Sequence, residues 1–218
     1  MNSADLQILK DLNWRFLHPW GKRRIYTIAL QNGKLYTAKL IDIKNFNKEG
    51  WDSALALEQH INILQCISVD ILSNNVAILM EHANLPSLEE ILSSPYKSPP
   101  EYIVREIVGQ ILDGVKFLHD NNVTHGKLTA DSILFQNLEK SDICVAKIDN
   151  YGFTSPPDDD ERRDMIESIS GQQDTDDIIN ADMKKFDVFM VGLLMMRLLA
   201  KGSDTLNTTQ LPEGKLRK

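Results

Sequence analysis

The chain has 218 residues, of which 42% are hydrophobic and 25% are charged, and its formal net charge is −7. This length and hydrophobic content allow one substantial core or two small lobes, and the charged fraction is ordinary for a soluble globular protein. No apolar run reaches membrane-spanning length and no secretory signal opens the chain, so we expect a cytoplasmic protein that uses no membrane. Cys66 and Cys144 match no metal spacing, and we expect two buried, reduced thiols.

The charge is unevenly distributed along the chain. Residues 156–182 contain ten acidic residues against two arginines, whereas the first 47 residues contain eight lysines and arginines against three aspartates. Such polarity can orient a partner, although acidic segments are more often solvated loops.

In the N-terminal half, the pattern changes from short strands to a helix and back. A short helical pattern precedes residue 20, and an Asn32-Gly33 turn between two β-rich runs predicts a hairpin. Apolar residues then recur at helical spacing, which predicts a long helix. The expected strands are Ile25–Leu30, Lys34–Ile41, Val69–Leu72 and Val76–Met80, and the expected helix is Trp51–Ile67.

The C-terminal half is richer in helical patterns. Ser87 with Glu90 three residues later forms a capping box, and residues 101–121 carry a wide apolar stripe that predicts a helix against a large core. A short strand pair is expected at Ile133–Phe135 and Ile143–Ile148, followed by an acidic, unstructured loop at about 155–182. Phe186–Leu199 is almost wholly apolar, which predicts a buried helix.

The order of elements predicts an α+β fold with two lobes. Residues 1–81 would form a small antiparallel sheet lobe with one long helix, and residues 82–218 a mainly helical, abbreviated second lobe. Together they would make one domain.

Several stretches, in the right order from about His18 to Gly202, resemble the protein kinase family. They are similar to its strand-three lysine motif, its gatekeeper and hinge, its catalytic loop H-R-D-L-x-x-x-N, its D-F-G region and the start of its central helix. In this chain they read Thr37-Ala38-Lys39-Leu40-Ile41, Ala77-Ile78-Leu79-Met80-Glu81-His82, His125-Gly126-Lys127-Leu128-Thr129-Ala130-Asp131-Ser132, Lys147-Ile148-Asp149-Asn150-Tyr151-Gly152-Phe153 and Phe186-Asp187-Val188. The resemblance implies a bilobal kinase-like fold.

Three positions depart from the residues that this family uses for chemistry. Lys127 stands where the family has its catalytic aspartate, Ser132 where it has a metal-binding asparagine, and Asn150 where it has the D-F-G aspartate. A protonated lysine accepts no proton, and a neutral amide is a weak ligand for Mg²⁺. We therefore expect no catalytic residues, no metal site and no cofactor, with ATP binding weak or absent.

Lys39 matches the family's phosphate-binding lysine, so it is either a residual nucleotide contact or a strand-end lysine paired with a nearby carboxylate. Two alignments compete for its usual glutamate partner, Glu58 and His60, and the local pattern favours His60. The glycines of the family's phosphate loop are missing, with Trp20 and Arg23 at two of their positions. His125, Asp187 and Gly152 match the family's structural frame.

This combination resembles a pseudokinase, a kinase fold that regulates a protein partner. The resemblance implies an active kinase domain as the partner, on the same or another chain, with a homodimer as a further arrangement. One candidate is the pseudokinase domain of the amino-acid-starvation translation-initiation-factor kinase. Trp51, Glu58 and His60, with the hinge side, are the expected regulatory surface. The alternative is an atypical nucleotide-binding enzyme with residual phosphotransferase activity, built on Lys39, Asp149 and Asp131. Nucleic-acid binding is disfavoured by the overall acidity.

Overall fold

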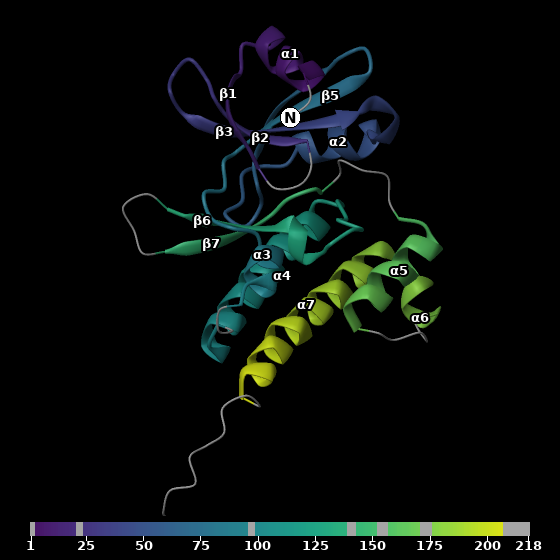
Figure 1. Ribbon diagram of the computed structural model, residues 1–218. Coiled ribbons are helices and arrows are strands. Elements are labelled where there is room, and N and C mark those ends of the chain that lie inside the picture. The colour runs from purple at the N-terminus through teal and green to yellow at the C-terminus, as the bar shows by residue number, and fades with distance from the viewer. Residues whose placement is uncertain are drawn as a thin grey trace, which may run out of the picture.

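The computed structural model describes residues 3–20, 24–95, 99–138, 143–151, 157–170 and 176–206. They form a small β-rich lobe and a larger helical lobe, the α+β arrangement expected from the sequence (Figure 1). Helix α1 lies at the outer end of the small lobe, and the long helix α7 crosses the larger one (Figure 1).

The small lobe is built on a five-stranded antiparallel sheet in the order β1-β2-β3-β5-β4. The predicted hairpin is confirmed: β2 pairs with β3 around Gly33, whose φ of 76° suits a residue without a Cβ. The strands are β1 (Arg15–Pro19), β2 (Ile25–Ala29), β3 (Leu35–Asp42), β4 (Cys66–Ile71) and β5 (Asn75–Met80).

Helix α1 (Ser3–Asp11) is held on the sheet by a buried carboxylate. Asp5 is 1% exposed and accepts hydrogen bonds from Arg24 and, at 2.6 Å, from the Tyr26 hydroxyl. Burial and the bond to Asp5 raise the pKa of Tyr26 to about 12. Leu9 and Trp14 complete the attachment by packing into the apolar core on this face of the sheet.

The predicted helix Trp51–Ile67 is wrong in its extent. The helical segments here are a single short turn, η1 (Ile43–Asn45), and α2 (Lys48–Leu55), and residues 57–60 form no regular element. Ile63 and Leu64 instead run beside β7 (Cys144–Ile148), where Leu64 N–H donates to the Ile148 carbonyl at 2.9 Å. These two residues are buried, whereas Ile61 is 56% exposed, so the apolar spacing of this segment does not mark one face of a helix.

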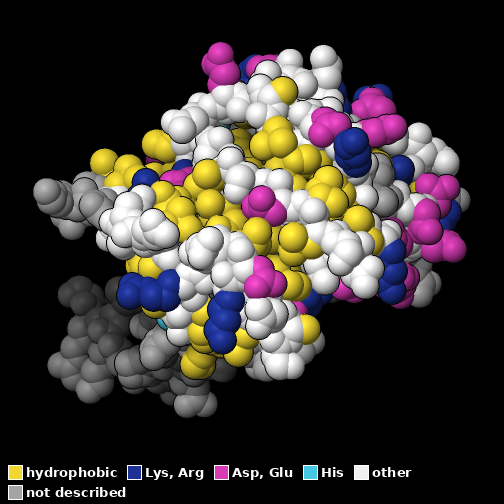
Figure 2. All heavy atoms as spheres, turned by 90° about the horizontal axis from the view of Figure 1, so that it is seen from above, with side chains coloured by type: hydrophobic (Ala, Val, Ile, Leu, Met, Phe, Trp, Pro, Cys, Tyr) yellow, Lys and Arg dark blue, Asp and Glu magenta, His cyan; other side chains and the backbone are white. Residues whose placement is uncertain are grey.

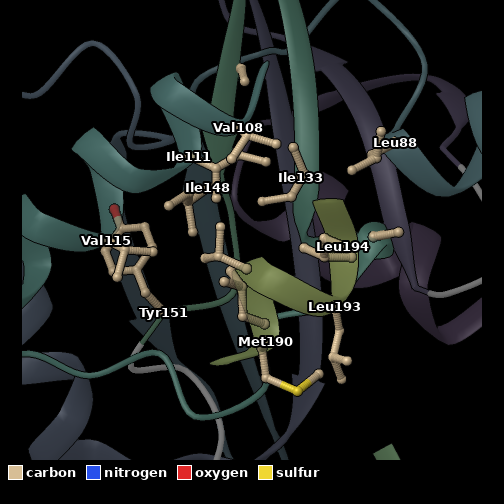
Figure 3. Close-up of a cluster of buried hydrophobic side chains, with 14 of the residues drawn as sticks. Leu88, Val108, Ile111, Val115, Ile133, Ile148, Tyr151, Met190, Leu193 and Leu194 are labelled. Atoms are coloured by element: carbon tan, nitrogen blue, oxygen red, sulfur yellow. The ribbon is translucent and has the colours of Figure 1, made fainter. Parts of the chain in front are cut away.

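The larger lobe packs helices around a two-stranded sheet. Its core brings together side chains from α3, α4, β6, β7 and α7, with Tyr151 among them (Figure 3). The elements are α3 (Leu88–Ser93), α4 (Glu101–Asp120), η2 (Ala130–Ser132), β6 (Ile133–Asn137), β7 (Cys144–Ile148), α5 (Asp159–Ser170), α6 (Asp176–Ile179) and α7 (Met183–Leu206). The Ser87–Glu90 capping box begins α3 as predicted.

Two predictions about the larger lobe are wrong. The acidic stretch predicted as a loop contains α5 and α6, because Ile166 and Ile179 each supply a buried apolar anchor. Arg162 fixes these helices together by donating to the Ile179 carbonyl at 2.7 Å. Helix α7 is not buried all round either, since Val188 and Met196 are each 50% exposed.

Cys144 is exposed rather than buried, whereas Cys66 is buried as expected. Burial raises the pKa of the Cys66 thiol to about 12, so this thiol stays protonated. Within the described part of the chain, no helix is long and apolar enough to cross a membrane.

The two lobes are joined by a short set of polar contacts near the hinge. Ile148 N–H donates to the Asn62 carbonyl at 2.8 Å, and the Tyr151 hydroxyl donates to the Leu64 carbonyl at 2.7 Å. Lys147 of β7, with 6% of its side chain exposed, pairs with Glu81 at 2.9 Å. These contacts fix the orientation of β7, and therefore of the residues that follow it, against the small lobe.

Asp5→Asn should lower the free energy of unfolding by roughly 3 kcal/mol at pH 7, because it leaves the Arg24 charge without its buried partner. Burial opposes ionisation of Asp5, but the bonds from Arg24 and Tyr26 outweigh it and hold the pKa of Asp5 below its ordinary value. Its stabilisation is therefore present above the pKa of the unfolded chain and is lost as the pH falls through the folded value.

Urea unfolding from pH 7 to pH 3 measures this difference. Asp52→Asn, which neutralises an exposed carboxylate on α2, is the control and should change stability little. A constant gap between Asp5→Asn and the unmodified chain down to pH 3 would contradict the assignment.

Candidate functional site

The carboxylate of Asp187 holds the backbone of the loop between α4 and β6 in place. Asp187 is fully buried on α7 and accepts hydrogen bonds from the backbone N–H groups of His125 at 2.8 Å and Gly126 at 2.7 Å. The His119 ring lies 2.9 Å from the same carboxylate. A buried carboxylate is stable only when donors surround it, and the loop backbone supplies two of them.

The His125 ring links this loop to the end of β7. Burial lowers the pKa of His125, so the ring is neutral. Its Nε2 lies 2.8 Å from the Asp149 carbonyl and therefore donates, while its Nδ1 accepts from the Lys127 N–H at 3.2 Å. His125 thus fixes the spacing between the loop and the residues that follow β7, while Gly152 lies outside the described residues.

Gly126 is a further departure from H-R-D that the sequence reasoning did not use. Its φ is 75°, and a Cβ at this position would lie 3.1 Å from Pro157 Cδ. Glycine therefore permits both the left-handed backbone and the close approach of the segment that leads into α5.

Lys127 is bound to an acidic residue of α5. Its Nζ lies 3.3 Å and 3.2 Å from the two carboxylate oxygens of Glu161, and the two side chains are partly exposed. Glu161 is itself positioned by a reciprocal pair of hydrogen bonds with Asp158 at the start of α5. Glu161 is not found from the sequence, because the acidic stretch predicts a loop. The docking of α5 beside Lys127 depends on tertiary packing, which the local pattern does not show.

Ser132 and Asn150 occupy the positions where the resemblance implies metal ligands. The Ser132 hydroxyl is 1% exposed, donates to the Thr129 carbonyl at 2.7 Å and accepts from the Thr129 N–H at 2.9 Å. Asn150 has a φ of 69°, a conformation that asparagine tolerates better than most residues.

Two adjoining cavities open between the lobes, and they share Ile25, Asp131 and Asn150. The first has a volume of about 430 Å³ and is lined by Lys39 and Lys127 among others. The second has a volume of about 440 Å³, and its further lining residues include Trp20, Thr37, Leu134 and Asp149.

The inner part of the second cavity holds a buried carboxylate oxygen without a partner. Asp149 is 3% exposed, and its Oδ1 forms no hydrogen bond within the described part of the chain. Trp20 lies at the hinge end of this cavity, with its ring 5.4 Å from that of His82.

The structure places the three expected surface residues in different environments. Trp51 is 3% exposed and belongs to the small-lobe core, so its assignment to a binding surface is wrong. Glu58 is exposed. The His60 ring stacks on Phe117 of α4 with centroids 4.5 Å apart, so His60 lies against the larger lobe.

Comparison with known proteins supports the kinase resemblance. A family model described as protein kinase domain matches residues 25–211. The chain is 26% identical over 154 residues to MAP kinase kinase kinase mkh1 of Schizosaccharomyces pombe, covering 68% of the chain and 13% of that protein. It is 24% identical over 210 residues to a probable serine/threonine-protein kinase PLK of Dictyostelium discoideum, covering 91% and 21%.

A third relative, eukaryotic translation initiation factor 2-alpha kinase 1 of Plasmodium falciparum, is 27% identical over 124 residues, covering 56% of the chain and 8% of that protein. The chain therefore spans only 13% and 21% of the first two relatives and less of this one.

These matches correct two expectations from the sequence. The view that the domain is no enzyme is overturned, because the matched family is the protein kinase domain and the relatives include proteins named as serine/threonine-protein kinases. The expectation of no cofactor is overturned for the same reason, because this family normally uses ATP and Mg²⁺.

The side chains present fit the nucleotide better than the metal. Ile25, Thr37 and Leu134 offer a slot for a planar base, and Lys39 lines the neighbouring cavity, where phosphates would lie. At the two implied metal positions, Ser132 is engaged by Thr129 and Asn150 carries no charge. The carboxylates among the described residues that line these cavities are Asp131 and Asp149, with Glu89 and Glu90 in the second cavity.

Asp187→Ala should lower the free energy of unfolding by roughly 3 kcal/mol, because two buried N–H groups lose their acceptor. Backbone amide exchange at residues 124–134 should accelerate more than exchange in the small-lobe sheet. Chemical denaturation and hydrogen exchange read by mass spectrometry measure both effects. Asp177→Ala, an exposed aspartate on α6, is the matched control. Uniform acceleration across both lobes would contradict a local bracing role.

Proposed function

Because the chain belongs to the protein kinase domain family, we propose that it is a regulatory member of that family, which binds and controls an active kinase domain on the same or another chain. The observation that carries this proposal is the combination at the catalytic loop. Asp187 and His125 retain the buried frame, while Lys127 stands at the position of the catalytic base and pairs with Glu161. A protonated lysine cannot accept the substrate's proton, so the usual base-assisted step is weakened.

The surface proposed for the partner is a groove on the hinge side of the molecule, with a volume of about 860 Å³. We call it the hinge groove. Its lining includes His60 and Glu81 and three residues with unusually exposed apolar side chains: Leu35 is 43% exposed, Ile61 56% and Ile67 45%. Exposed apolar side chains gathered in a groove favour protein binding.

Apolar side chains also reach the surface at the small-lobe end, where they gather across the middle of that face with a few acidic side chains among them (Figure 2). Glu58, exposed in the segment between α2 and β4, borders the residues that enter the groove.

The translation-initiation-factor kinase among the relatives suggests one biological setting. We propose an eIF2-alpha-type kinase domain as the first partner to test, since the chain is 27% identical to part of one such protein. The corresponding hypothesis is that this chain is a pseudokinase-type domain of the amino-acid-starvation kinase.

Ile61→Asp with Ile67→Asp should weaken binding to the partner kinase at least 10-fold, because each buries a carboxylate in an apolar contact. The kinase activity of the partner should then no longer respond to the domain. Titration calorimetry and a phosphorylation assay of the partner measure both effects.

Ile71→Asp is the control, because Ile71 is a 58% exposed isoleucine of β4, the strand that carries Ile67, and does not line the groove. Both variants should keep their melting temperature within a few degrees. Equal loss of binding in the control would show that the hinge groove is not the contact.

A second candidate function is an atypical phosphotransferase that uses Lys39, Asp149 and Asp131. The observation that favours it is the unpartnered, buried Oδ1 of Asp149 in the cavity shared with Asp131. Carboxylates are the ligands that Mg²⁺ prefers. In this case ATP with Mg²⁺ should raise the melting temperature more than ATP alone, and Asp149→Asn should remove that difference. Equal shifts with and without Mg²⁺ would exclude this arrangement.

A further inference from the structure

Helix α7 carries apolar side chains on two opposite faces. Its inner face packs into the core of the larger lobe and includes Met190, Leu193 and Leu194 (Figure 3). The outer face is exposed, with Val188 and Met196 each 50%, Met195 39% and Leu199 41% exposed. Residues 188, 192, 195, 196 and 199 follow helical spacing and therefore form one stripe along the helix. We call Val188, Gly192, Met195, Met196 and Leu199 the α7 stripe.

The α7 stripe contains no charged residue. The charged residues of α7 between residues 186 and 199 are Asp187, which is fully buried, and Arg197, which pairs with Glu89 of α3. A continuous apolar face of this kind is uncommon on the surface of a soluble domain and is typical of a contact surface.

Polar contacts at both ends of α7 hold the stripe in a fixed position. At the first turn, Asp187 accepts from the loop backbone at His125 and Gly126. At the last turns, Arg197 donates two hydrogen bonds to Glu89, and Lys201 donates to three carbonyls at the end of α3 at 2.6 to 2.7 Å. A surface that is ordered in advance loses little conformational entropy when a partner covers it.

The arrangement of the α7 stripe is symmetric about its midpoint, which lies between residues 193 and 194. Val188 and Leu199 are equally distant from this point, and so are Gly192 and Met195. A two-fold interface requires that one patch fits a second copy of itself, so small residues must lie opposite large ones. When two α7 helices cross antiparallel at the midpoint, each Met195 lies opposite Gly192 of the other copy.

The space over Gly192 can receive that side chain. No atom from another part of the chain lies within 4 Å of the point where a Cβ of Gly192 would be. Methionine is long and flexible, and it adapts well to such a space. The charges at the ends favour the same direction, because Lys185, 75% exposed, is one turn before Val188. A parallel crossing would bring the two Lys185 ammonium groups together, whereas an antiparallel crossing separates them.

We propose that a second copy of this chain covers the α7 stripe, with the two α7 helices antiparallel and in contact at Gly192 and Met195. This dimer goes beyond the proposed control of a partner kinase, since the α7 stripe shares no residue with the hinge groove. Few side chains take part on each copy, and each copy carries a net charge of −7, so the dimer is reversible. Its dissociation constant is expected on the order of 10 μM.

Sedimentation velocity of the full chain from about 1 to about 300 μM, in about 0.15 M salt to screen the net charge, tests the proposal. The fraction of dimer should rise with concentration. Met195→Glu should weaken association at least 10-fold, because it places a carboxylate in the apolar contact. Ile71→Glu is the control: it adds the same charge at a 58% exposed side chain of β4 and should leave association unchanged.

Gly192→Leu separates association from folding. Leucine is a better helix former than glycine and meets no neighbour at this exposed position, so the melting temperature should stay equal or rise. Association should nevertheless weaken about 10-fold, because the new side chain occupies the space that Met195 of the second copy needs.

Three results would overturn the proposal. The chain could stay monomeric over the whole range of concentration. A dimer could form whose affinity is unchanged in Met195→Glu and Gly192→Leu, which would place the contact on another face. A monomer whose binding to the partner kinase weakens in Met195→Glu would show that the partner, and not a second copy, covers the α7 stripe. The Ile61→Asp with Ile67→Asp variant should dimerise normally, so failure of the hinge groove and failure of the dimer are distinguishable.

Discussion

The buried carboxylate of Asp187 is the interaction on which the geometry between the lobes depends. An ionised group without access to water is stable only when donors surround it, and the N–H groups of His125 and Gly126 meet that need. The same two bonds fix the loop backbone. The His125 ring then donates to the Asp149 carbonyl, which fixes the end of β7 relative to the loop. Removal of one charge would therefore disturb both the loop and the residues after β7.

The charged side chains beside this frame are held in a different way. Lys127 lies on the loop that Asp187 braces, and its ammonium group pairs with Glu161 of a helix that the acidic segment forms. The frame and the reactive groups thus have separate physical causes. The frame is maintained by burial and hydrogen bonding, whereas the charge at the cavity follows from a few side chains that can change without unfolding the domain.

Much of the fold followed from local signals in the sequence. The Asn32-Gly33 turn, the Ser87 capping box and the stripe of α4 each specify an element through contacts within a few residues. Not every apolar residue of α4 is buried, since Leu112 is 42% exposed. Periodicity alone does not separate a helix from an irregular segment at residues 56–64, where contacts of Asn62 and Leu64 with β7 determine the path.

The site was predictable as a set of positions but not as a set of contacts. Alignment with the kinase motifs pointed to Lys39, Lys127, Ser132 and Asn150, and all except Ser132 line the two cavities between the lobes. No local sequence pattern pointed to Glu161, because its contact with Lys127 requires α5 to dock beside a loop 34 residues earlier in the chain. His60 was expected beside Lys39, but its stacking on Phe117 depends on how the lobes meet.

The proposed regulatory role places the contact with a partner kinase at the hinge groove and not at the catalytic loop. It is tested by the phosphorylation rate of the partner kinase in the presence of a variant that carries the family's residues at the three positions, Lys127→Asp with Ser132→Asn and Asn150→Asp. Control of the partner should be unchanged in this variant, because the hinge groove is untouched. Loss of that control in the triple variant would contradict the proposed contact.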